Sequence, residues 1–173
     1  MYGRNLRKLE DLMESLGLSS ILITSPENIE YFLDVETIGD STLLLHISKD
    51  GGKLYVPLLE YFRFRDRLKD VVEVVGVSRS IEVSDAVLVK KTWKEIISDI
   101  VNSESKIGVD LSYTSPLSSI LSSLNSEKII DISRNISGFR MIKDDWEIEN
   151  IVEAINITGR VIHRIIDNVT NDT

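Results

Sequence analysis

An acidic loop offers the first candidate chemistry in this sequence. In LDVETIGDS, which follows Tyr31, the carboxylates Asp34, Glu36 and Asp40 could hold a cation or face the amine of a substrate. A loop whose charges are only solvated explains the same residues and is favoured by the residue types alone. We therefore predict Tyr31, Asp34, Glu36 and Asp40 as no more than a candidate substrate- or partner-facing loop.

The other reactive side chains do not form a catalytic or metal-binding set. His46 and His163 have no neighbours at metal-ligand spacing. Ser103 to Lys106 matches S-x-x-K but lacks the companion motifs of a serine nucleophile. Asp110 follows a predicted strand, where α/β sheets often present ligand-binding residues, although a turn or helix-cap role is commoner there. We predict no catalytic residue and no metal ligand in this chain.

Composition excludes several classes of protein. The formal net charge of -8 argues against binding to nucleic acid, which requires clustered Lys and Arg. The absence of cysteine excludes disulfides and thiolate chemistry. No apolar run approaches the roughly 20 residues that cross a bilayer, and the first residues lack the features of a signal peptide. We expect a cytoplasmic protein that binds neither membrane nor nucleic acid.

One basic segment, Tyr61 to Lys69 (YFRFRDRLK), runs against this charge balance. Its arginines alternate with aromatics and could form a base-stacking patch. An amphipathic helix explains the segment better. Its expected buried residues are Leu58, Leu59, Phe62 and Leu68.

The elements that must position these residues alternate along the chain. Apolar periodicity predicts a helix over residues 4–16 ending at Gly17, and later helices in 58–69, 91–102 and 116–124. Short apolar runs predict strands, two of them joined as a hairpin around Asp50-Gly51-Gly52. This order predicts an α/β fold, a three-layer mixed sheet with flanking helices, followed by a C-terminal helix.

The C-terminal helix begins a new segment. Asp144 and Glu147 have the spacing of a capping box, which places a boundary near Gly138 to Lys143. We expect one domain over 1–140 and a further segment over 141–173. The helix is apolar around much of its circumference, which predicts self-association. The residues concerned are Ile155, Ile157, Val161, Ile162, Ile165 and Ile166.

The order of these motifs resembles the prolidase, aminopeptidase P and creatinase family. NLRKLEDLMESLGLSSILITSPENIEYFL resembles the family's opening helix, strand and N-x-x-Y-F/L element, KDGGKLYVPLLEY its hairpin, and KIGVDLSYTS its I-G-x-[DE] strand. FRMIKDDWEIENIVEA resembles its hinge signature. The residues that fit that signature are Arg140, Ile142, Lys143, Glu147, Ile148 and Ala154.

The resemblance implies a creatinase/prolidase-type N-terminal domain that is not itself catalytic. The parent would be an Xaa-Pro dipeptidase or aminopeptidase whose separate "pita-bread" domain binds two divalent metal ions (Mn, Co or Zn) and cleaves proline-containing peptides. This domain would contribute to homodimer contacts and to active-site closure, with Arg140, Lys143 and Glu147 at the hinge to the catalytic domain. Residues 141–173 would then be the hinge and the first helix of an otherwise missing catalytic domain. The chain alone is then expected to be inactive and to carry no cofactor.

One departure from the family pattern concerns the acidic loop. Relatives carry Y-F/L-[ST]-G where this chain has Tyr31-Phe32-Leu33-Asp34, so a glycine-dependent loop conformation is expected to differ. The alternative function, from another class, is a stand-alone α/β interaction or dimerisation module without peptidase activity.

Overall fold

The computed structural model describes residues 3–37, 41–112, 115–124 and 127–171. The chain forms two compact units, Met1–Ser137 and Gly138–Thr173. We call them the first and second unit and describe each by itself.

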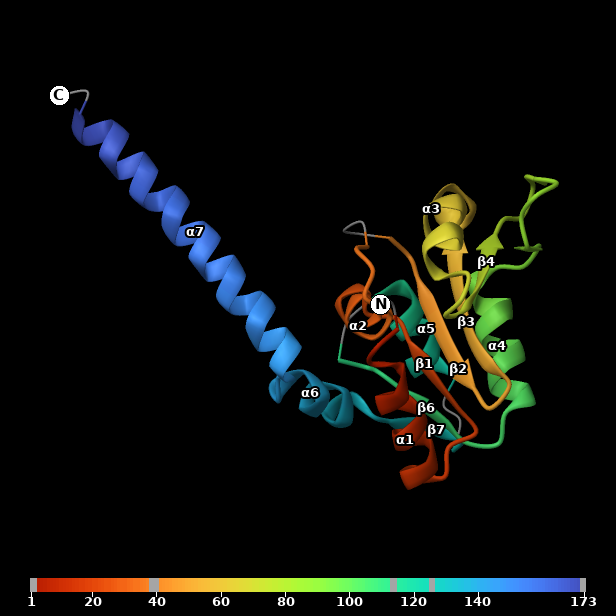
Figure 1. The fold of residues 1–173 in the computed structure, drawn as a ribbon. Coiled ribbons are helices and arrows are strands. Elements are labelled where there is room, and N and C mark those ends of the chain that lie inside the picture. The colour runs from red at the N-terminus through yellow and green to blue at the C-terminus, as the bar shows by residue number, and fades with distance from the viewer. Residues whose placement is uncertain (1–2, 38–40, 113–114, 125–126, 172–173) are drawn as a thin grey trace. The chain divides into compact units, whose positions relative to one another are not determined.

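The first unit is built on one mixed sheet (Figure 1). Its strands are β1 (Ser20–Ile23), β2 (Leu44–Ser48), β3 (Gly51–Pro57), β4 (Glu73–Val77), β5 (Leu88–Val89), β6 (Ile107–Val109) and β7 (Ile129–Asp131). Their order is β5-β4-β3-β2-β1-β6-β7. Within the described residues β2 alone is antiparallel to its neighbours, and every other pairing is parallel. Parallel strands require crossover helices, which explains the alternation seen in the sequence.

Helices cover both faces of this sheet. They are α1 (Leu6–Leu16), α2 (Pro26–Leu33), α3 (Leu58–Leu68), α4 (Trp93–Ser103) and α5 (Pro116–Ser123). A further helix, α6 (Ser133–Met141), follows β7. The buried side chains of α4 and α5 pack with Leu22, Leu44 and Val109 on one face. The helices α1, α2 and α3 cover the opposite face, where Ile21 and Ile47 point because successive strand residues alternate. The predicted three-layer α/β fold is confirmed.

Two glycines provide backbone conformations that other residues adopt with strain. Gly17 ends α1 at φ 61°, and Gly51 opens β3 at φ 123°. The turn between β2 and β3 consists of Lys49 and Asp50, with Ser48 paired to Gly51. Both the predicted end of the first helix and the predicted hairpin are confirmed.

The buried face of α3 differs from the prediction. Tyr61, Phe64 and Leu68 are buried, whereas Leu59 is 97% exposed and Phe62 is 42% exposed. The expectation that Leu59 and Phe62 are buried is wrong. Helical spacing is compatible with burial of either face, and packing against the sheet decides between them. The buried face is the one that carries Tyr61, whose ring lies against Gly76. A Cβ added at Gly76 would be 3.3 Å from that ring.

A short helix, α6, was not predicted. Just before its start, the Asp131 carboxylate accepts hydrogen bonds from the amide of Ser133 at 2.9 Å and from its hydroxyl at 2.5 Å, which forms a local turn. Ile136 is its buried residue. With few apolar residues and a glycine inside, the segment has too weak a periodic pattern to be recognised by sequence alone.

The second unit consists mainly of α7 (Asp145–Asn171), which confirms the predicted C-terminal helix. The Glu147 carboxylate accepts a hydrogen bond from the amide of Asp144 at 2.8 Å, as the capping pattern requires. Among the described helices, none is both long and apolar enough to span a membrane.

Candidate functional site

Tyr31, predicted as part of the candidate loop, lies in the last turn of α2 instead, where Asn5 and Lys8 hold it. The Nδ2 of Asn5 donates to the Tyr31 carbonyl at 2.9 Å, and the Lys8 ammonium donates to the Tyr31 hydroxyl at 2.8 Å. The same ammonium lies 5.3 Å from the centre of the Tyr31 ring, within the range of a cation–π interaction. The end of α2 that precedes the loop is therefore fixed in position by residues 23 to 26 positions earlier.

Asp34 ends α2 in a left-handed conformation, with φ 54° and ψ 46°. Its amide donates to the Glu30 carbonyl at 2.8 Å, which closes the last turn of the helix. Asp34 is the one non-glycine residue of the described chain with positive φ. The backbone therefore adopts here the conformation that glycine favours, although the side chain is an aspartate. The expectation that the aspartate changes the backbone conformation at this position is wrong.

The rest of the loop is tied back to α2 and α3. The Glu30 carboxylate accepts from both the amide and the hydroxyl of Thr37 at 2.7 Å, and Arg63 donates to the carbonyl of Glu36 at 3.0 Å. The Glu36 side chain is exposed. Asp40 lies outside the described residues. Within the described ranges, no three His, Cys, Asp or Glu side chains come close enough to hold a metal ion.

A buried polar pair lies at the carboxyl end of β6. Asp110 is fully buried and accepts a 2.5 Å hydrogen bond from the Nδ2 of Asn28 in the first turn of α2. Its other carboxylate oxygen accepts from the amide of Ser112 at 3.0 Å. This turn and bridging role confirms the commoner of the two interpretations of Asp110. Sequence reasoning missed Asn28 as its partner because the two residues are 82 positions apart.

His46 lies on β2 with its side chain mostly buried. Its Nε2 is 3.9 Å from a carboxylate oxygen of Glu104 and, among the described atoms, has no hydrogen-bond partner. Burial lowers the pKa of His46, the nearby Glu104 opposes that shift and Lys53 adds to it. The packed role predicted for this histidine is confirmed.

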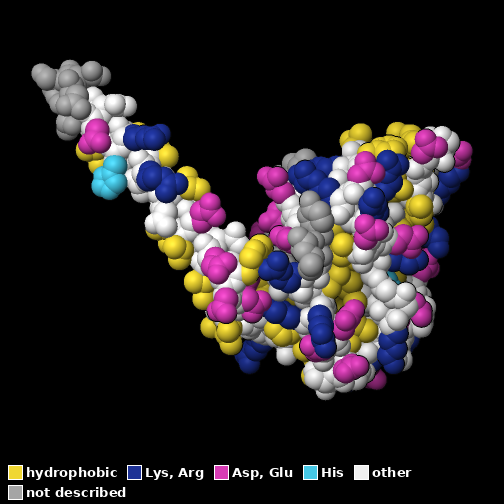
Figure 2. Space-filling model, in the orientation of Figure 1, with side chains coloured by type: hydrophobic (Ala, Val, Ile, Leu, Met, Phe, Trp, Pro, Cys, Tyr) yellow, Lys and Arg dark blue, Asp and Glu magenta, His cyan; other side chains and the backbone are white. Residues whose placement is uncertain are grey.

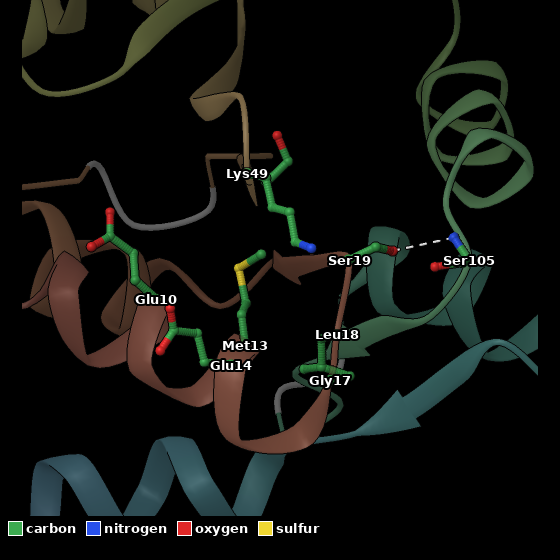
Figure 3. A pocket seen from close by; sticks show the side chains of 9 residues that line it. Glu10, Met13, Glu14, Gly17, Leu18, Ser19, Lys49 and Ser105 are labelled. Carbon is green, nitrogen blue, oxygen red and sulfur yellow. Dashed lines mark hydrogen bonds between the residues drawn. The ribbon is translucent and has the colours of Figure 1, made fainter.

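A cavity of about 540 Å³ opens beside the C-terminal end of α1 (Figure 3). Its lining residues are Glu10, Met13, Glu14, Gly17, Leu18, Ser19, Ser48, Lys49 and Ser105. The Ser19 hydroxyl accepts from the amides of Ser105 at 3.2 Å and Lys106 at 3.1 Å, which fixes one wall. The size suits a small ligand, and both signs of charge reach the rim. Sequence analysis missed it because its walls come from segments far apart in the chain.

Comparison with known protein families matches residues 5–142 to the creatinase/prolidase N-terminal domain. The chain belongs to this family. The match covers the whole seven-stranded sheet, so this N-terminal domain corresponds to the first unit together with the end of α6. A comparison with curated proteins found no match.

Solved structures share the fold of this N-terminal domain. An Xaa-Pro dipeptidase from Bacillus anthracis superposes with a TM-score of 0.69 at 16% identity, over 94% of this chain and 42% of the dipeptidase. The prolidase from Pyrococcus furiosus gives 0.64 at 23% identity, over 94% and 46%. The N-terminal domain of Xaa-Pro dipeptidase from Lactobacillus brevis gives 0.55 at 15% identity, over 77% of this chain and 98% of that domain. The chain thus spans less than half the length of the first two proteins.

The residues of the family's hinge signature lie where α6 gives way to α7. Arg140 is in the last turn of α6, and the Lys143 ammonium donates to the carbonyl of Met141 at 3.3 Å. Glu147 caps α7 as described above. Met141 and Ile142 are exposed, at 75% and 79%. These contacts are local, and the assignment of the segment as a hinge stays a prediction.

Proposed function

We propose that this chain is the non-catalytic N-terminal domain of an Xaa-Pro dipeptidase or aminopeptidase. The observation that carries the proposal is the family match over residues 5–142, together with the shared fold of dipeptidases and prolidases. In this proposal the peptidase chemistry belongs to a metal-dependent catalytic domain of the parent protein, which would use two divalent ions (Mn, Co or Zn) on proline-containing peptides in the cytoplasm.

The domain's proposed contribution is to dimer contacts and to closure of the active site. The loop of Asp34 and Glu36, together with Tyr31 at the end of α2, suits that role because α2 and α3 hold the loop backbone while Glu36 stays exposed. A fixed loop can meet a partner surface without a large loss of conformational entropy. Arg140, Lys143 and Glu147 are the proposed hinge residues.

A direct assay tests the proposal. The purified chain is incubated with Mn²⁺, Co²⁺ or Zn²⁺ and with Xaa-Pro dipeptides and longer peptides, beside the Pyrococcus furiosus prolidase as the active control. We expect no cleavage and no stoichiometric metal in the chain by elemental analysis. Metal-dependent turnover by the chain would overturn the proposal.

A second candidate is a stand-alone interaction or dimerisation module without peptidase activity. The closed core of the first unit agrees with a module that folds by itself, since the side chains of Leu22, Phe32 and Ile97 are each 0% exposed. The reading frame of the gene discriminates between the two. Metal-ligand motifs encoded downstream of codon 173 would support the peptidase domain, and a stop codon there would support the module.

A further inference from the structure

The cavity beside α1 lies away from the loop to which the proposed function assigns a role. That loop follows α2, whose Tyr31 contacts Lys8 near the start of α1, whereas the cavity adjoins the last turns of α1. Its other walls come from the turn between β2 and β3 and from Ser105, just before β6. All of its lining residues belong to the first unit, so its walls do not depend on α7.

Two hydroxyl groups of these walls already have their hydrogen-bond partners. The Ser19 hydroxyl, which accepts from two amides, also donates to the Lys106 carbonyl at 3.0 Å. The Ser48 hydroxyl donates to the carbonyl of Gly51 and accepts from the amide of Asp50, both at 3.3 Å. These contacts fix the walls, and they leave the two hydroxyls little capacity to bind a ligand.

Three charged groups of the cavity have no partner among the described residues. The carboxylates of Glu10 and Glu14 and the ammonium of Lys49 are exposed and make no hydrogen bond or ion pair there. Acidic and basic side chains are interspersed over the face of the first unit that Figure 2 shows, and such neighbours can pair, as Lys53 and Glu73 do at 3.1 Å. The charges of the cavity are therefore available to a ligand that carries charges of its own.

The negative and positive groups stand on different walls. Glu10 and Glu14 are one helical turn apart on the same face of α1, and the C-terminal end of this helix adds partial negative charge. Lys49 comes from the hairpin turn, and in Figure 3 the Met13 side chain lies between its ammonium and the two glutamates. Met13 and Leu18 are buried and form an apolar floor. The cavity thus has a negative end, an apolar middle and a positive end.

We propose that this cavity binds an ω-amino carboxylate, a small molecule with an ammonium group at one end of an aliphatic chain and a carboxylate at the other. The ammonium would lie between Glu10 and Glu14, which together offer it several acceptor oxygens. The aliphatic chain would cover Met13, whose flexible thioether adapts to the shape of its partner. The carboxylate would accept hydrogen bonds from Lys49. The proposal goes beyond the proposed function and does not rest on it.

Other classes of ligand match these walls less well. A metal ion needs several oxygen or nitrogen ligands, and no three His, Cys, Asp or Glu side chains of the described ranges converge to supply them. An inorganic anion would meet two carboxylates, and a simple amine would leave the Lys49 ammonium unpaired. A ligand with both charges meets a group of opposite sign at each end.

A chain-length series tests the two charged ends. The isotope-labelled full chain is titrated with ω-amino carboxylates from β-alanine to ω-aminooctanoate, and its amide chemical shifts are followed by NMR. We expect shifts at Glu14, Leu18 and Lys49, and the tightest binding at one intermediate length. The Kd there should be about 1 mM, because exposed ion pairs each contribute little.

Analogues of the best ligand test each part of it. The alkanoate and the alkylamine of the same length lack one charged end each and should bind about 5-fold more weakly. Triglycine has both charged ends but a polar middle. It should also bind more weakly, because its amide groups would lose water against Met13.

Variants of the chain test which residues bind which end. Lys49→Met should weaken the best ligand about 5-fold without weakening its alkylamine analogue. The double variant Glu10→Gln, Glu14→Gln should weaken the best ligand without weakening its alkanoate analogue. Asp11→Asn is the matched control, because one residue turns the helix by about 100° and Asp11 is outside the cavity lining. Circular dichroism confirms that each variant keeps its fold.

Four outcomes would each overturn the proposal. They are the absence of saturable binding up to tens of millimolar ligand, an affinity that does not depend on chain length, triglycine binding as tightly as the best ligand, and a loss for Asp11→Asn as large as that for the double variant. The peptidase assay responds to none of these changes, so the two proposals fail independently.

Discussion

Ile97 in α4 and Ile155 in α7 are the same residue type on helices of similar amphipathic character, yet Ile97 is 0% exposed and Ile155 is 64% exposed. The first unit supplies a sheet and a second helix to cover Ile97. The second unit consists mainly of one helix, and one helix cannot bury its own apolar face. The comparison shows that apolar periodicity specifies a helix and its apolar face. Burial of that face depends on whether the remaining chain or a partner provides a surface that packs against it.

The largest expected effect tests this difference directly. Ile97→Ala should lower the free energy of unfolding by about 3 kcal/mol, through lost burial and the cavity left behind. Ile155→Ala should change the unfolding of the first unit by less than about 0.5 kcal/mol. Urea titrations at low protein concentration, followed by circular dichroism, measure both values. Equal losses would mean that the two units share one core.

The next effect concerns polar contacts. Asn28→Ala should cost about 2 kcal/mol, because the buried carboxylate of Asp110 loses a hydrogen-bond donor. The matched control is Asn150→Ala on α7, which removes an exposed 2.8 Å hydrogen bond to the Trp146 carbonyl and should cost little. The same urea titrations apply. A negligible loss for Asn28→Ala would show that Asp110 finds another donor.

The two histidines extend the comparison to pH. Burial lowers the pKa of His46 in the folded state, so the unfolded chain, with a histidine pKa of about 6.5, takes up the proton first as pH falls. The stability of the first unit should therefore be complete above about pH 6.5 and decline below it until the folded-state pKa is reached. His46→Gln should reduce this decline, whereas His163→Gln on α7 should leave it unchanged. Thermal unfolding between pH 5 and 8 measures the slopes.

The smallest expected effect concerns the loop after α2. Asp34→Gly should raise the free energy of unfolding by about 0.5 kcal/mol, because glycine adopts the left-handed conformation with less strain. Gly17→Ala, at the left-handed end of α1, should have the opposite sign. If both variants are destabilising, the Asp34 side chain makes a favourable contribution that outweighs the backbone strain.

Most elements of the first unit were predictable because their signals are local. The stretch around Leu22, the hairpin at Gly51 and the end of α1 at Gly17 depend on neighbouring residues only. The buried face of α3 was not predictable, since Leu59 and Tyr61 both satisfy helical spacing and only the sheet selects between them.

The candidate site was harder to predict than the fold. Tyr31 and Asp34 were predicted as loop residues, but Tyr31 lies in α2 and Asp34 ends that helix. Their partners, Lys8 and the carbonyl of Glu30, became visible only in the folded chain. The link between Asn28 and Asp110 and the cavity beside Lys49 join segments that are distant in sequence. Periodicity carries no information about such pairs.

By itself, the sequence determined the alternation of helices and strands, the motif order of the creatinase/prolidase N-terminal domain, and the apolar periodicity of α7, because each depends on the spacing of nearby residues. The tertiary structure decided which faces are buried, which groups donate hydrogen bonds to Asp110, and that the acidic loop is held by α2 and α3. Those outcomes depend on strands and helices meeting across the sheet. They are decided by packing and hydrogen bonding between residues that are remote along the chain.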